Sequence, residues 1–208
     1  MPSFRLRAVL IAVVIAAFGA AGCVQAQEDA GVSSERPSFQ DTTDYNLIYV
    51  PTPPEVVDRM MELGGVSSQD TVYDLGSGDG RMVIRAARQY DAYGVGIEID
   101  HERVVKSRKN AKKAGVTDQV EFREKDFFKA DFSEATVLLL YLLPDKLDKL
   151  KSKLVDEVEP GTPIVTHDFQ FDGWEPDSSA RVAVSDPIWG QYKENYRWTE
   201  PDEPTTSE

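Results

Sequence analysis

One short stretch constrains the fold of this chain more than any other. Thr71 to Leu75 predicts a buried strand, which runs directly into Gly76-Ser77-Gly78-Asp79-Gly80. The apolar residues from Met82 to Ala87 then follow helical spacing. A strand, a glycine-rich turn and a helix in this order are typical of an α/β protein whose turn lies against a bound ligand.

The same alternation continues along the chain. Further strands are predicted at 93–99, 120–123, 135–143 and 162–169, and further helices at 56–63, 101–114 and 147–158. The last two predicted strands, 181–185 and 191–199, have no helix between them. We therefore expect a doubly wound, mostly parallel sheet of seven strands with an antiparallel C-terminal hairpin. Ligands of such sheets bind at the carboxyl ends of the strands.

Composition excludes several classes of function. The 208 residues carry a net charge of -13, which repels phosphate backbones, so nucleic acid is not an expected partner. One cysteine, Cys23, and two histidines, His101 and His167, are too few for a disulfide framework or a Cys/His zinc site. No metal is expected.

The two ends differ from the middle. Residues 1–26 have Arg5 and Arg7 before a short apolar run, which predicts an export signal and membrane association through this segment alone. The signal fits lipidation at Cys23, cleavage after Ala26, or retention as a short anchor. Residues 27–44 and 199–208 are acidic and predicted to be disordered, which leaves 45–198 as the folded domain.

The charges around the glycine turn indicate what it binds. A dinucleotide fingerprint needs a third glycine where Arg81 stands, and Asp74 and Asp79 would repel a pyrophosphate. A cationic or neutral polar ligand fits this acidic turn better. The alternative is that the turn binds no ligand and that its glycines only allow a tight turn.

Carboxylates follow two further predicted strands. Glu98 ends the second strand and can accept hydrogen bonds from ribose hydroxyls, whereas Asp100 fits the N-cap of the next helix. After the third strand, Asp126 with Phe127 fits adenine recognition, and equally a solvated turn carboxylate.

Between Tyr49 and Trp198 the chain resembles the class I S-adenosylmethionine-dependent methyltransferases. It is most similar to the family of lysine methyltransferases that act on the ATP synthase c-ring protein and the adenine nucleotide translocase. The segments that carry this are Tyr49-Val50-Pro51-Thr52, Asp74 to Arg81, Leu154 to Gly161, and Asp168-Phe169 followed by Trp174-Glu175-Pro176.

The resemblance implies a cofactor, S-adenosyl-L-methionine, and roles for the residues that match. Tyr49, Pro51 and Thr52 would close over the cofactor, Asp74 and the turn Gly76, Ser77, Gly78, Asp79 and Gly80 would hold its amino-acid end, Glu98 its ribose and Asp126 its adenine. The fourth strand runs into Tyr141-Leu142-Leu143-Pro144, which departs from the Asn/Asp-Pro-Pro-Tyr of amino-directed nucleic-acid methyltransferases.

The expected reaction is N-methylation of a lysine in a protein or, less specifically, of a small amine. A lysine amine with a pKa near 10.4 must lose a proton before it attacks, and an apolar slot beside a sulfonium favours that loss. The candidate walls of the slot are Tyr141, Pro144, Phe169 and Trp174, with Asp168 as the orienting acceptor or, equally, a loop cap. His167 is expected to face away from Asp168, because neighbours on a strand alternate sides.

Two other functions fit the sequence. The export signal favours a non-catalytic binding protein of the cell envelope that keeps the fold, and a small-molecule methyltransferase is the third class. Because the methyl donor is cytosolic, a cytoplasmic location is the alternative to the cell envelope.

Overall fold

The structure is a computed structural model that describes residues 49–199. The predicted signal with Cys23 and Ala26, the linker 27–44, the start of the domain at 45 and the tail beyond 199 lie outside the described residues. Helices and strands alternate up to β5, after which two strands follow with only a short 3-10 helix between them. In chain order the elements are α1 (Pro54–Gly64), β1 (Thr71–Leu75), α2 (Arg81–Tyr90), β2 (Tyr93–Glu98), α3 (His101–Ala114), β3 (Val120–Glu124), η1 (Phe127–Lys129), β4 (Val137–Leu140), α4 (Pro144–Glu157), β5 (Ile164–His167), β6 (Ser178–Ala183), η2 (Pro187–Trp189) and β7 (Tyr192–Trp198).

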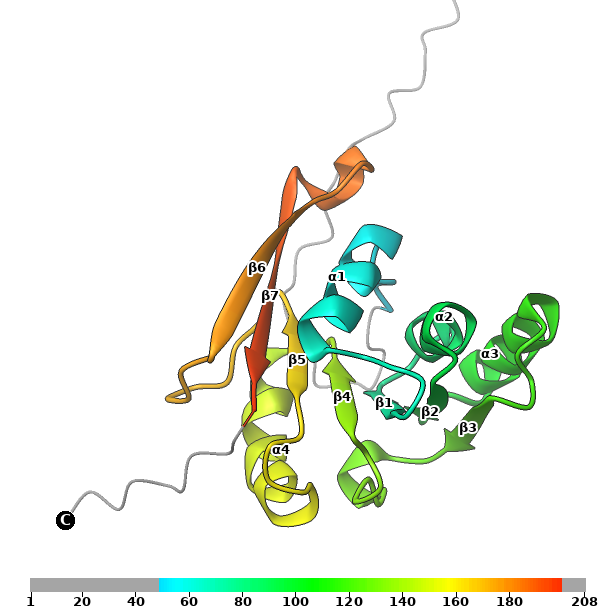
Figure 1. Ribbon diagram of the computed structural model, residues 1–208, viewed down its shortest axis with the longest axis horizontal. Coiled ribbons are helices and arrows are strands. Elements are labelled where there is room, and N and C mark those ends of the chain that lie inside the picture. Colours follow the sequence, from blue (N-terminus) through cyan, green and yellow to red (C-terminus); the bar gives the residue numbers. More distant parts are fainter. Residues whose placement is uncertain (1–48, 200–208) are drawn as a thin grey trace, which may run out of the picture. The chain divides into compact units, whose positions relative to one another are not determined.

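All seven strands form one sheet, in the order β3-β2-β1-β4-β5-β7-β6. The first five pair in parallel, and β7 runs antiparallel between β5 and β6 (Figure 1). The α/β prediction with a closing hairpin is therefore confirmed. Because β1 lies beside β4 on one side and β2 on the other, the chain reverses its winding direction at β1, where ligands of such sheets bind.

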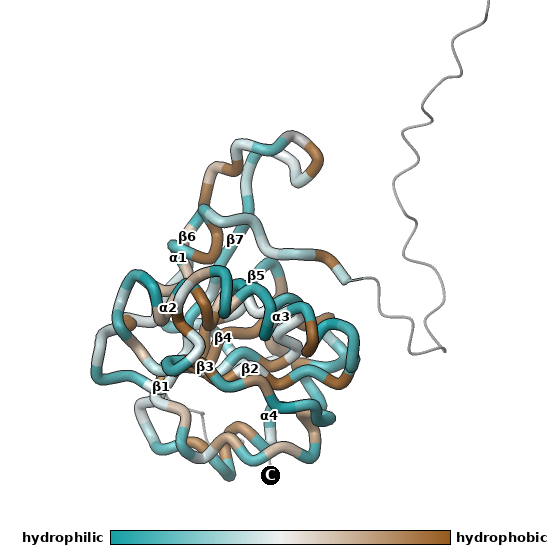
Figure 2. The backbone as a smooth tube through the Cα atoms, turned by 90° about the vertical axis from the view of Figure 1, so that its right-hand side faces the viewer, coloured by the Kyte–Doolittle hydropathy of each residue, from teal (hydrophilic) through white to brown (hydrophobic). Residues whose placement is uncertain are grey.

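Alternate residues of the central strands face different helices. Val137 and Leu139 of β4 pack with α1 and α2, whereas Leu138 and Leu140 pack with the leucines of α4. All four are buried, because helices cover both faces of β4. In Figure 2 the hydrophobic colour follows β4, while the surface helix α3 is largely hydrophilic.

Local signals set the helix boundaries. The carboxylate of Asp100 accepts a hydrogen bond from the backbone N–H of Arg103 (3.1 Å), which confirms it as the N-cap of α3. Gly115 ends the same helix in the left-handed conformation. Within residues 49–199, no helix combines the length and the apolar character that a membrane span requires.

Candidate cofactor and acceptor site

The turn after β1 is tied to the neighbouring strand. The backbone N–H groups of Gly76 and Ser77 both donate to the carbonyl oxygen of Ile97, at 2.8 and 2.9 Å. Gly76 and Gly78 have φ values of 84° and 54°, a region in which side chains other than glycine are strained. The turn is therefore held against β2, and its backbone at Gly76 and Gly78 carries no side chain of its own.

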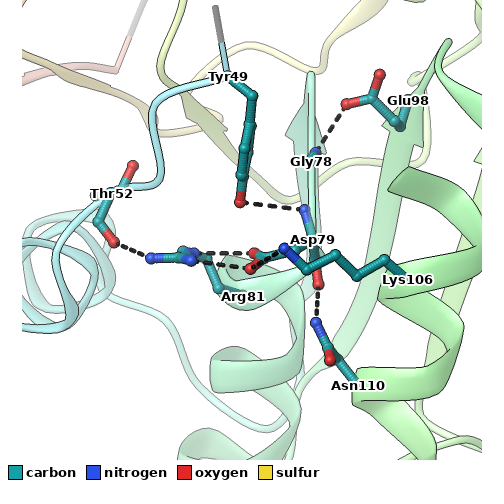
Figure 3. Close-up of polar contacts among 8 residues, drawn as sticks. All are labelled: Tyr49, Thr52, Gly78, Asp79, Arg81, Glu98, Lys106 and Asn110. Carbon is teal, nitrogen blue, oxygen red and sulfur yellow. Dashed lines mark hydrogen bonds and ion pairs between the residues drawn. The ribbon is translucent and has the colours of Figure 1, made fainter. Parts of the chain in front are cut away.

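Glu98 points from the end of β2 towards this turn. One carboxylate oxygen accepts the N–H of Gly78 at 2.9 Å (Figure 3). The other accepts the N–H of Asp100 at 2.9 Å. The side chain is 5% exposed. Two backbone donors therefore fix the orientation of a buried carboxylate at the edge of the turn.

Asp74 is the second buried carboxyl group of the site, 3% exposed near the end of β1. Burial, and then repulsion from Glu98 and Asp79, raises the pKa of Asp74 to about 8. No residue of the described part of the chain donates a hydrogen bond to this carboxyl group. A cationic ligand beside Asp74 would favour its ionised form.

Tyr49 lies directly over the turn. A Cβ atom at Gly78 would come within 2.2 Å of the Tyr49 ring, so only glycine allows this close approach. The Tyr49 hydroxyl oxygen accepts the N–H of Asp79 at 3.4 Å, and Arg103 and Lys106 lie 5.1 and 5.7 Å from the ring centroid. Burial raises the pKa of Tyr49 to about 12, so the hydroxyl stays protonated near neutral pH.

The carboxylate of Asp79 is engaged by Arg81. Two nitrogens of the guanidinium donate to its two oxygens at 2.9 and 2.8 Å, and a third donates to the backbone carbonyl of Thr52 at 2.8 Å (Figure 3). Arg81 thus ties the segment that contains Tyr49 and Thr52 to the start of α2. In the sequence, Arg81 stands where a dinucleotide fingerprint has glycine and at the end of the matching segment, and no contact was predicted for it; the Asp-x-Arg spacing was the available signal.

Asp126 occupies the turn after β3. One oxygen accepts the N–H of Phe128 at 3.0 Å and caps η1, which supports the turn interpretation for that oxygen. The rings of Phe127 and Phe128 lie 4.5 Å apart beside it. Ile99, 55% exposed immediately after Glu98, is a further apolar surface that the sequence interpretation missed.

Two aromatic rings meet beyond the ends of β4 and β5. The half-buried rings of Tyr141 and Phe169 are nearly parallel, with an interplanar angle of 15° and centroids 6.2 Å apart. Burial raises the pKa of Tyr141 to about 12. Pro144 opens α4 at its first position and is exposed.

Asp168 and His167 lie closer together than the sequence predicted. The strand ends at His167, and Asp168 adopts a left-handed φ of 60°, so the strand alternation stops between them. An oxygen of Asp168 lies 3.5 Å from Nε2 of His167 and 2.5 Å from Nζ of Lys193. The expectation that the two residues face opposite sides was wrong.

Trp174 is not a pocket wall. It is 3% exposed, its ring centroid lies 5.0 Å from that of Phe171 and 6.0 Å from that of Trp198, and its carbonyl oxygen accepts the indole N–H of Trp198. The segment after β5 folds back onto the sheet and fills the core there. That prediction is corrected. His101, in contrast, lies on the surface as predicted, with Nδ1 2.8 Å from Glu124.

Comparison with known proteins decides the family. The family model of the ANTKMT methyltransferase domain matches residues 74–178, from the end of β1 to the start of β6. A protein-lysine N-methyltransferase of Saccharolobus islandicus is 45% identical over 135 residues, which is 64% of this chain and 84% of that protein. The chain belongs to the ANTKMT methyltransferase domain family. It is an S-adenosylmethionine-dependent methyltransferase, as the resemblance implied.

Two further relatives show how far this family likeness extends. A crystal structure described as an RNA methyltransferase from Salinibacter ruber in complex with S-adenosyl-L-homocysteine is 56% identical, with a TM-score of 0.68, and the match covers 74% of this chain and 95% of that one. The adenine nucleotide translocase lysine N-methyltransferase of Mus musculus is 32% identical over 120 residues, which is 56% of this chain and 50% of that protein. The chain therefore spans about half the length of that mouse protein.

The site residues fit the cofactor that a methyltransferase of this family uses. That cofactor supplies a methyl group on a cationic sulfur, and the turn offers bare backbone, a fixed carboxylate at Glu98 and an unpartnered buried carboxyl at Asp74. The ring of Tyr49 lies against the turn at Gly78. No cluster of three or more His, Cys, Asp or Glu side chains that could hold a metal occurs within residues 49–199.

Proposed function

We propose that this enzyme transfers the methyl group of S-adenosylmethionine to the amine of a lysine in a protein substrate. The observation that carries the proposal is the 45% identity to a protein-lysine N-methyltransferase over 84% of that protein's length. The uncharged aromatic surface of Tyr141 and Phe169, which follow β4 and β5, the next two strands of the sheet after β1, supports it.

On the cofactor side, each residue has a role suited to its contacts. Glu98 accepts from the ribose hydroxyls, and Asp74 with Gly76, Ser77, Gly78, Asp79 and Gly80 surrounds the cationic amino-acid end. Asp126, Phe127 and Ile99 receive the adenine. Tyr49, Pro51 and Thr52 close over the cofactor, and Asp79 acts indirectly, because Arg81 uses its carboxylate to hold the closing segment.

On the acceptor side, Tyr141, Pro144 and Phe169 form the wall and Asp168 orients the amine. Since Lys193 neutralises Asp168, the pocket carries little net charge. An acceptor amine that enters it loses water without gaining a strong counter-ion, which favours the neutral form that attacks the methyl group. Most of the rate enhancement then comes from positioning the amine in line with the methyl group.

RNA is the second candidate acceptor, because the 56% identical Salinibacter protein is described as an RNA methyltransferase. The net charge of -13 opposes it, since a chain with this excess of acids repels RNA. If this repulsion dominates, any methylation of RNA should increase with salt concentration, because salt screens the repulsion between like charges.

The N-terminal segment suggests a location. We propose that residues 1–26 direct the chain to the cell envelope, by lipidation at Cys23, cleavage after Ala26 or retention, and that only this segment meets the membrane. Cell fractionation with labelled palmitate tests it: label in the membrane fraction supports lipidation at Cys23, and an unlabelled cytosolic protein contradicts envelope location.

One experiment separates the acceptor classes. The protein is incubated with methyl-labelled S-adenosylmethionine and bacterial lysate split into protein, RNA and small-metabolite fractions, and labelled protein is hydrolysed to find methyl-lysine. Methyl-lysine in the protein fraction is expected; label confined to RNA or metabolites contradicts the proposal. Calorimetry with the cofactor runs alongside, with Glu98→Ala as the binding variant and the exposed Glu159→Ala as its matched control.

A further inference from the structure

His167 and Asn195 form a buried polar pair close to the acceptor wall. They lie opposite each other on the antiparallel strands β5 and β7, and both side chains are 0% exposed. Neither ring nitrogen of His167 and neither amide atom of Asn195 makes a hydrogen bond within the described part of the chain. Buried polar atoms without hydrogen bonds lower stability, so packing alone does not account for this pair.

The pair connects two groups of the acceptor pocket. The His167 ring lies against the Tyr141 ring with centroids 4.1 Å apart, and its Nε2 lies 3.5 Å from an oxygen of Asp168. One imidazole therefore contacts both the aromatic wall and the carboxylate. Asn195 is the residue paired with His167 on the neighbouring strand, and side chains directly opposite each other in an antiparallel pair lie on the same face of the sheet.

The backbone and the charges fit such a role. Asp168 has a left-handed φ of 60°, an unusual conformation for a residue other than glycine, and this turn brings its carboxylate back towards His167. Burial lowers the pKa of His167 to about 4, so the imidazole is neutral near pH 7 and adds no charge beside the Asp168–Lys193 ion pair.

We propose that His167, supported by Asn195, is a positioning residue for methyl transfer: it fixes the Tyr141 ring relative to the Asp168 carboxylate and so aligns the acceptor amine. This rests on the proposed lysine methylation. His167 does not contact the acceptor itself, since the described residues bury it completely.

The test uses two apolar variants of similar shape, His167→Phe and Asn195→Leu, in the full chain. His167→Phe keeps a ring against Tyr141 but removes both nitrogens. We expect kcat for methyl-lysine formation to fall about 10- to 100-fold in each variant. The melting temperature is expected to stay equal or rise, and the dissociation constant for S-adenosylmethionine to stay within about 2-fold, because the variants remove unpaired polar atoms away from the cofactor. The double variant should lose no more than the worse single one, as for residues that act as a unit.

The matched control is His101→Phe, which changes the other histidine of the chain, on the surface of α3, and should leave kcat unaltered. A kcat within about 2-fold of the parent in His167→Phe and Asn195→Leu overturns the inference. A fall in melting temperature that parallels the loss of kcat in both variants also overturns it, because the role is then structural. If the parent forms no methyl-lysine, the proposed function fails first and the inference fails with it.

Discussion

The proposed cofactor side and the proposed acceptor side of this enzyme are built in different ways. The cofactor side comes mainly from two short stretches, 74–81 and 98–103, and its carboxylates at Glu98 and Asp79 are held by nearby backbone or guanidinium donors. The acceptor side joins the ends of β4, β5 and β7, and its buried polar atoms at His167 and Asn195 have no hydrogen bonds among the described residues. The residues of the proposed cofactor side are held in place by contacts within short local motifs. Those of the proposed acceptor side depend on the pairing of strands that lie far apart along the chain.

The largest effect is expected for Trp174→Ala, which tests where the acceptor side ends. Because Trp174 belongs to the aromatic core with Phe171 and Trp198, its removal should cost about 3–5 kcal/mol of unfolding free energy, measured with urea. Trp189→Ala, in η2 and half-buried, is the matched control and should cost less than about 1 kcal/mol. If Trp174→Ala leaves the free energy of unfolding unaltered and raises the KM for the acceptor, Trp174 lines the acceptor pocket after all.

Glu98→Gln tests whether the fixed carboxylate at the glycine turn determines cofactor affinity. The amide can accept only one of the two backbone hydrogen bonds and binds a ribose less well, so cofactor affinity should fall on the order of 30-fold by calorimetry. The acceptor KM at saturating cofactor should stay the same. If the acceptor KM rises as much as the cofactor dissociation constant, the two sides are not independent.

Asp74 should make both cofactor binding and the free energy of unfolding depend on pH. Its pKa of about 8 in the folded protein lies above the ordinary value near 4, so folding takes up a proton and the free energy of unfolding should fall as pH rises from about 4 to about 8. A cationic cofactor favours the ionised form, so binding should release a proton and tighten by up to about tenfold per unit between pH 6 and pH 8. Asp74→Asn should flatten both profiles in calorimetry and urea unfolding; a parent profile already flat would contradict the raised pKa.

Arg81→Ala should have the smallest effect of the four. The substitution removes the contacts of Arg81 with Asp79 and with the Thr52 carbonyl. These contacts are partly exposed and should contribute about 1 kcal/mol to holding the entry segment. The measurement is the dissociation rate of S-adenosylhomocysteine, expected to rise about 3- to 5-fold as the Tyr49 segment loosens. Arg59→Ala, which removes an exposed ion pair with Glu62, is the control and should leave the rate unchanged.

Sequence predicted the fold and the placement of the glycine turn well because their signals are local. The strand at 71–75 and the helix at 101–114 match the structure residue for residue, since hydrophobic periodicity, the cap at Asp100 and Gly115 all agree. The orientation of Glu98 towards the turn also followed from its place at the end of a strand. The contact of Arg81 with the Thr52 carbonyl was missed because Thr52 lies 29 residues away and reaches Arg81 only when α2 packs beside the entry segment.

The acceptor side was predicted less well for a physical reason. Which side Asp168 faces depends on one left-handed backbone conformation, at the point where the pairing of β5 with β7 ends. Trp174 has the same aromatic character in a wall as in a core, and only the packing of its loop against Trp198 distinguishes them.

The sequence alone therefore determined the order of strands and helices, the bare turn and its carboxylates, because each depends on neighbours within a few residues. Tertiary structure alone decided that Tyr141, His167, Asp168 and Asn195 meet, because strand pairing brings together residues that lie far apart along the chain.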